Sequence, residues 1–187
     1  MNLPTWITVS RLLGVPFLLY GLHDPTVTNR WICLGIFLIV ASTDWLDGYL
    51  ARKLNQVTDL GKFLDPLVDK LLVFAPLLAF IELGKIPAWG VFLMLARELT
   101  IAGWRVNQTQ ISGANIWGKL KTVSQILAIA FLIAPLPDSW KLPTLILFWV
   151  SVGLTLISGL IYLIPQSSIQ TDIALRAREQ GTGKREQ

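Results

Sequence analysis

The chain has 187 residues, of which 53% are hydrophobic and only 15% are charged, and its mean hydropathy is +0.57. These values exclude an ordinary soluble globular domain. The small net charge of +4 is better explained by membrane topology and anionic lipid head groups than by nucleic-acid binding.

Six apolar runs approach the length of about 20 residues that a helix needs to cross a bilayer. They fall at Pro4–Leu22, Arg30–Arg52, Leu64–Leu83, Pro87–Val106, Gly118–Ala134 and Leu142–Ile164. Because backbone groups in lipid must be hydrogen-bonded within their own segment, we predict that each run is a helix. The expected fold is an all-α integral membrane protein with six transmembrane helices. Residues 1–165 would form this one domain, and residues 166–187 a polar cytoplasmic tail.

The basic residues predict the orientation. Thirteen of the 16 Lys and Arg residues lie at or near one set of helix ends, and the other three are Arg30, Lys85 and Lys141. The positive-inside rule then places both termini in the cytoplasm, together with the aspartate-bearing connection between the second and third runs. We therefore expect a multi-pass protein of the cell (inner) membrane. The sole histidine, His23, would lie in a solvated loop on the external side.

The second run ends with two aspartates and two small residues on one helical stripe. Asp44, Asp47, Gly48 and Ala51 are spaced i, i+3, i+4 and i+7. The small residues would let a bulky group approach the helix backbone, although packing against another helix is the alternative. Arg52, just beyond them, is a natural phosphate partner or an ordinary inside-positive anchor.

Two more aspartates open the third run. Asp65 and Asp69 are spaced i, i+4, and Pro66 suits the first turn of a helix, where its missing N–H is no loss. The linker Lys53–Lys62 would let the two helices run antiparallel with their cytoplasmic ends adjacent. All four carboxylates would then converge on one pocket.

Four converging carboxylates would repel one another unless cations neutralise them. Ionisable groups at membrane depth are costly, so the default interpretation is functional. With no His or Cys nearby, the expected ions are hard divalent cations, Mg²⁺, Mn²⁺ or Ca²⁺. Two such ions would suit the polarisation of a pyrophosphate.

The complete pattern resembles the signature of the CDP-alcohol phosphotransferase family. It reads Asp-x-x-Asp-Gly-x-x-Ala-Arg, eight residues, Gly-x-x-x-Asp-x-x-x-Asp from Asp44 to Asp69. The resemblance implies a six-helix homodimer that transfers a group from a CDP-linked donor to an alcohol, with release of CMP. It implies Mg²⁺ or Mn²⁺ held by Asp44, Asp47, Asp65 and Asp69, with Asp69 also acting as the general base. It further implies a CDP-donor site formed by Thr5, Gly48, Ala51, Arg52 and Gly61.

Basic residues on the fourth and fifth runs predict where the acceptor binds. Arg97, Arg105, Lys119 and Lys121 would form a cationic pocket for an acceptor that carries its own phosphate, and Glu98 would orient an arginine. Inside-positive anchoring is the alternative, and it fits Arg97 least because that residue lies within an apolar helix.

The pattern of these residues resembles that of the phosphatidylglycerophosphate synthase subfamily. The opening Asn-Leu-Pro-Thr at residues 2–5 also resembles the start of that subfamily's sequences. That resemblance implies CDP-diacylglycerol and glycerol-3-phosphate as substrates. From composition and charge we expect a lipid bilayer around the protein and no nucleic-acid partner.

Three alternatives remain open at this stage. A related transferase would use another acceptor: phosphatidylglycerol, as in cardiolipin synthase, inositol phosphate or serine. A cation or proton transporter could use clustered aspartates, although we find no internal duplication of the kind many transporters show. A structural membrane protein could pair the acids with arginines.

Overall fold

The computed structural model describes the backbone of residues 3–53, 59–106 and 116–163, and the side chains of residues 10–43, 66–104 and 116–161. Within these ranges the chain is all-helical, without strands. The elements are α1 (Leu3–His23), α2 (Val27–Lys53), α3 (Asp59–Glu82), α4 (Ala88–Val106), α5 (Ile116–Ile133), a short 3₁₀ helix η1 (Asp138–Trp140) and α6 (Lys141–Leu163). Each predicted run corresponds to one α-helix.

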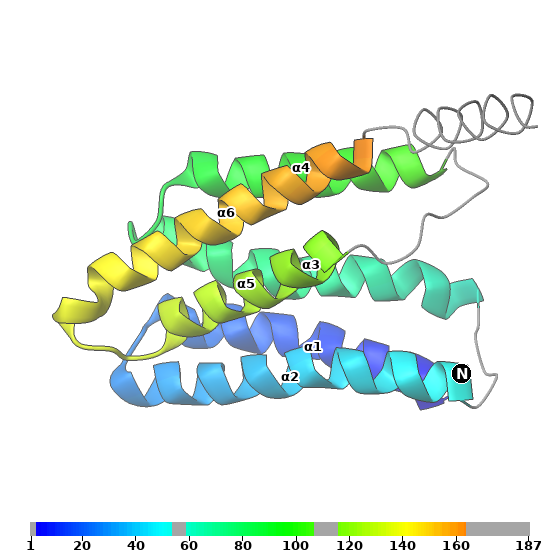
Figure 1. Ribbon diagram of the computed structural model, residues 1–187. Helices are drawn as coiled ribbons and strands as arrows, with labels where there is room; N and C mark the ends of the chain where they lie inside the picture. Colours follow the sequence, from blue (N-terminus) through cyan, green and yellow to red (C-terminus); the bar gives the residue numbers. More distant parts are fainter. Residues whose placement is uncertain (1–2, 54–58, 107–115, 164–187) are drawn as a thin grey trace, which may run out of the picture.

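The helices alternate in direction along the bundle (Figure 1). Helix α1 packs against both α2 and α3, and α6 packs against α4 and α5. As a result, the start of α1, the end of α2, the start of α3 and the end of α4 lie at one end of the bundle, together with the start of α5 and the end of α6. We call this the motif end, because it carries the aspartate signature.

The start of α3 differs from the prediction. The helix begins at Asp59 rather than near residue 64, so Pro66 lies inside it and not in its first turn. Proline offers no N–H to the carbonyl four residues earlier, but one missing bond does not end a helix whose neighbouring turns are intact. Asp65 and Asp69 therefore stand within the first half of α3 and not at its first residues.

Local signals set several helix ends. Thr26 caps α2, because its Oγ1 accepts a hydrogen bond from the N–H of Asn29 at 3.2 Å. Helix α3 ends at Glu82, and Gly84, two residues further on, has a φ of 65°, which suits glycine. There the N–H groups of Gly84 and Lys85 donate to the carbonyls of Ile81 and Phe80.

The core runs along the bundle axis, and the outer surface is also apolar. Leu18, Phe37, Ile133 and Phe148 are fully buried in the core. Large apolar side chains are exposed on every helix, among them Leu13, Phe17, Ile39, Leu78, Phe92, Ile116, Leu142 and Leu160. Soluble monomers rarely expose so much apolar surface, whereas a bilayer accepts it.

Two helices, α5 and the η1–α6 segment, are long and apolar enough to cross a membrane by length and composition alone. That test covers only the part of the chain described above. It supports membrane association without establishing six spans.

Arg30 joins α2 to the end of α5. Its Nε donates to the carbonyl of Ile133 at 2.9 Å, and its Nη2 donates to those of Leu132 and Ala134 at 3.0 and 2.7 Å. The last carbonyls of a helix have no partner within the helix and carry its negative dipole end, so a guanidinium stabilises them. The sequence had indicated only an external positive charge.

Replacing Arg30 by alanine is expected to destabilise the fold by about 1–3 kcal/mol, because three carbonyls lose charged donors. Thermal denaturation in detergent should show a lower midpoint, with unchanged activity per folded molecule. Lys141→Ala is the matched control, since that exposed residue pairs only with exposed Asp138 among the described residues. An unaltered midpoint for Arg30→Ala would contradict the capping role.

Candidate active site

The aspartate signature lies at the motif end. Asp44, Asp47, Gly48, Ala51 and Arg52 stand in the last turns of α2, while Gly61, Asp65 and Asp69 stand in the first half of α3. Thr5 is in the first turn of α1, at the same end of the bundle.

Of these residues, only Asp69 has a described side chain. The convergence of the four carboxylates therefore lies outside the described residues. No group of three or more His, Cys, Asp or Glu side chains comes together among the residues whose side chains are described. Because that search does not include Asp44, Asp47 or Asp65, the predicted metal site stays a prediction.

Asp69 is held by an arginine that sequence analysis did not assign to the site. Arg11 of α1 donates from Nη1 to Oδ1 of Asp69 at 2.9 Å. The Arg11 side chain is 2% exposed and that of Asp69 is 42% exposed, so the carboxylate remains accessible beside a buried cation. A buried charge persists only when it is paired. Arg11 could have been found from the sequence, because it is an arginine within an apolar run, which is the feature that singled out Arg97.

The predicted acceptor residues form a second group on α4 and α5. Oε1 of Glu98 accepts hydrogen bonds from Nη1 of Arg97, at 2.9 Å, and from Nζ of Lys121. These three side chains are between 12% and 15% exposed. We call them the Glu98 cluster. It combines two positive charges with one negative charge, so one positive charge is in excess.

The remaining acceptor residues differ in what the structure describes. Lys119 lies in the first turn of α5 and is exposed. Arg105 is in the last turn of α4, but its side chain lies outside the described residues. Lys70, which follows Asp69 on α3, is close enough for its charge to act on Lys121. Helix α5, which carries Lys121, also packs against α3, the helix that carries the last two aspartates.

Two residues of α6 also belong to this group, and sequence analysis missed them. Ser158 accepts a hydrogen bond from Nη2 of Arg97 at 2.9 Å, and Gly159 lies against the stem of the same arginine. Their only signal was a small-residue pair in an apolar run, which is common where helices pack in membranes.

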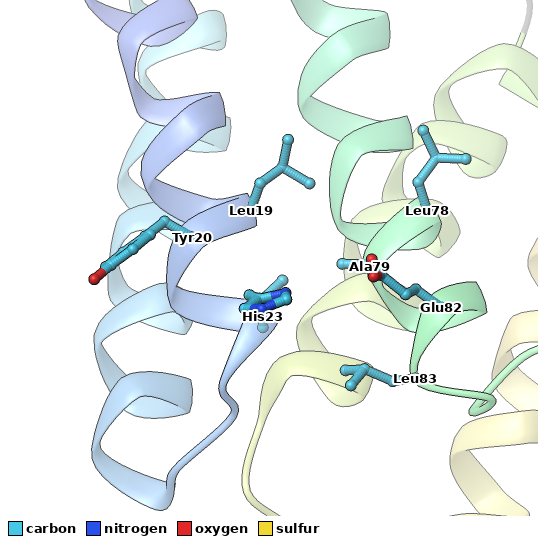
Figure 2. Close-up of a pocket in the computed structure, with 8 residues that line it drawn as sticks. Leu19, Tyr20, His23, Leu78, Ala79, Glu82 and Leu83 are labelled. Atoms are coloured by element: carbon cyan, nitrogen blue, oxygen red, sulfur yellow. The ribbon is translucent and has the colours of Figure 1, made fainter.

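A hollow of about 610 Å³ lies at the opposite end of the bundle, between the ends of α1 and α3 (Figure 2). Figure 2 shows His23 and Glu82 on its two sides, with Tyr20 directed away. His23 is the last residue of α1, not part of a loop, although it is exposed as expected. Asp69 precedes Glu82 by thirteen residues, or roughly 20 Å along a helix, so this hollow is separate from the candidate site.

A sequence model of the CDP-alcohol phosphatidyltransferase family matches residues 1–157. The chain belongs to this family of membrane-bound transferases, as the aspartate signature had indicated.

Curated proteins are similar in sequence to this chain over most of its length. A CDP-diacylglycerol–glycerol-3-phosphate 3-phosphatidyltransferase of Bacillus subtilis is 39% identical over 177 residues, covering 84% of this chain and 91% of the relative. A protein of the same name from Haemophilus influenzae is 34% identical over 185 residues, covering 93% and 98%. Another, from Yersinia pestis, is 34% identical over 172 residues, covering 87% and 93%.

Proposed function

We propose that this protein transfers a phosphatidyl group from CDP-diacylglycerol to glycerol-3-phosphate, giving phosphatidylglycerophosphate and CMP. The names of the similar proteins support this reaction. The structural observation that carries the choice of acceptor is the Glu98 cluster, whose excess positive charge lies at the motif end. An acceptor with its own phosphate suits such a site, whereas an uncharged alcohol does not require it.

The four aspartates of the signature would hold two divalent cations, Mg²⁺ or Mn²⁺. The donor set fits these ions, because it offers carboxylate oxygens and neither imidazole nor thiolate. The accessible carboxylate of Asp69 also fits the role of a ligand. When bound, the ions would neutralise charge on the donor's diphosphate. Thr5, Gly48, Ala51, Arg52 and Gly61 would contact the CDP part of the donor.

Asp69 would act as the general base. The acceptor hydroxyl attacks the phosphorus that carries diacylglycerol, a new P–O bond forms, and the bond to CMP breaks. The hydroxyl proton passes to the Asp69 carboxylate, with Arg11 as its counter-charge. Arg52 and the residues of the Glu98 cluster orient the two phosphorylated substrates. The signature contains no Ser, Cys or His nucleophile, so transfer would be direct.

The membrane arrangement is also part of this proposal. Six transmembrane helices would place both termini and the motif end in the cytoplasm, in agreement with the positive-inside rule. The exposed apolar side chains on every helix support burial in lipid. We propose one membrane domain over residues 1–165, a cytoplasmic tail over 166–187, and a homodimer in the inner membrane.

The acceptor is tested with purified protein in lipid nanodiscs that contain CDP-diacylglycerol and Mg²⁺. We expect CMP release with glycerol-3-phosphate and little with phosphatidylglycerol, inositol phosphate or serine. Lys121→Gln should raise the half-saturating glycerol-3-phosphate concentration roughly tenfold or more, because a charged hydrogen bond contributes about 1.5–3 kcal/mol. Lys141→Gln, at the other end of the bundle, is the control. Absence of CMP release with glycerol-3-phosphate would refute the proposed function.

A further inference from the structure

The side chain of Arg97 packs against α6, and it does not extend unpaired into the proposed acceptor site. Its side chain is 13% exposed, and Nη2 donates to Oγ of Ser158 at 2.9 Å. Nη1 donates to Glu98, and the buried Nε makes no hydrogen bond within the described part of the chain. Both terminal nitrogens therefore already contact protein groups.

Gly159 makes this enclosure possible. A Cβ added at Gly159 would lie 2.8 Å from Cγ and 3.0 Å from Nε of Arg97. Cγ is near the root of the side chain, so it cannot move aside unless Arg97 changes its rotamer or α4 moves away from α6. Gly153, on the same helix, has no atom within 4 Å of the corresponding position. Close approach is thus required at Gly159 and not at Gly153.

Ser158 is itself held in place. It is 5% exposed, and its Oγ donates to the carbonyl of Thr155 at 2.9 Å while it accepts from Arg97. Thr155, fully buried, accepts a hydrogen bond from Nε2 of Gln125 on α5 at 3.0 Å. The hydroxyl that contacts Arg97 is therefore fixed by a buried, hydrogen-bonded interface between α5 and α6.

A continuous set of contacts runs from α6 to Lys121. Ser158 and Gly159 set the position of Arg97, Arg97 binds Oε1 of Glu98, and the same oxygen binds Lys121. An arginine that is fixed on one side and paired on the other orients its carboxylate partner. Lys121 has three donors, of which Glu98 takes one, so it can still bind a phosphate.

We infer that Ser158 and Gly159 are positioning residues for acceptor binding, acting through Arg97 and Glu98 on Lys121. This inference rests on the proposed function and refines it, because it assigns Arg97 an indirect role. Helix α6, which carries no residue of the aspartate signature, thereby controls the affinity for the phosphorylated acceptor.

The test uses Ser158→Ala and Gly159→Ala, with Gly153→Ala as the matched control. CMP release is measured against glycerol-3-phosphate at saturating CDP-diacylglycerol, and then with the two roles exchanged. We expect the half-saturating glycerol-3-phosphate concentration to rise about tenfold in both variants, the size expected when a charged hydrogen bond is lost. The half-saturating donor concentration should stay within about twofold of wild type, and Gly153→Ala should match wild type in both.

A second measurement separates positioning from a general loss of structure. If Ser158 acts through Lys121, then Ser158→Ala should have almost no further effect on acceptor saturation in a Lys121→Gln background. Unchanged acceptor saturation in Ser158→Ala would overturn the inference, as would equal losses for donor and acceptor, or fully additive effects in the double variant. Because Ser158→Ala removes only one hydroxyl, it remains informative if Gly159→Ala fails to fold.

Failure of the proposed function would look different. Wild-type enzyme would then release no CMP with glycerol-3-phosphate, whatever stands at residues 158 and 159. Failure of the inference alone would leave wild-type activity in place and the variants' acceptor curves unchanged.

Discussion

Replacing Asp69 by asparagine is expected to lower turnover by roughly 10²–10⁴-fold, the usual contribution of a general base. Asparagine keeps the shape and one oxygen of the side chain, but it cannot accept the proton of the attacking hydroxyl. Binding of the CDP-linked donor should weaken much less than turnover falls. Single-turnover measurements with bound donor, together with donor titration, separate the two effects.

Asp138→Asn is the matched control for this substitution. Asp138 is exposed in η1, at the end of the bundle away from the signature, and pairs with Lys141 at 2.8 Å. It should leave both turnover and donor affinity at wild-type values. If Asp69→Asn abolishes donor affinity while bound donor still turns over, then Asp69 is not the base and only a binding role remains.

Removal of divalent cations is expected to abolish CMP release, and Mg²⁺ or Mn²⁺ should restore it. The reason is electrostatic: four carboxylates that converge on one site would repel one another and the donor's diphosphate until cations neutralise them. Activity is measured after treatment with a chelator and again after titration with each ion.

A second readout is independent of activity. An ion that binds only the folded protein stabilises it, by about 2.7 kcal/mol at 100 times its Kd. Mg²⁺ should therefore raise the thermal midpoint of wild type and of Asp138→Asn, and raise it much less in Asp44→Asn. Full activity in the presence of chelator would contradict the metal site, and so would an undiminished thermal shift in Asp44→Asn.

The six helices could be predicted because their signal is local. A run of about 20 apolar residues has few alternatives to a helix in lipid, so each predicted run matched an observed helix. The boundaries were less certain where polar residues flank a run. The start of α3 was placed five residues too late, because Asp59 to Phe63 are not uniformly apolar and Pro66 resembles a first-turn residue.

The amino-acid sequence by itself determined the family, through the resemblance of its aspartate pattern to a known signature. It also determined the helical fold and the assignment of the signature residues to α2 and α3, because apolar run length and helical spacing suffice for these. It also grouped Arg97, Arg105, Lys119 and Lys121 in one cationic pocket for a phosphorylated acceptor, with Glu98 orienting an arginine. Only the tertiary structure decided which partners they have.

Arg11 and Asp69 are 58 residues apart, Arg97 and Ser158 are 61 apart, and Arg30 and Ile133 are 103 apart. Contacts at such separations depend on which helix faces pack together. The apolar periodicity of one helix shows which of its own faces is buried, but it does not show which face of another helix packs against it. The close approach at Gly159 is of the same kind. Its importance follows from where the stem of Arg97 lies, and that position is a property of the packed bundle.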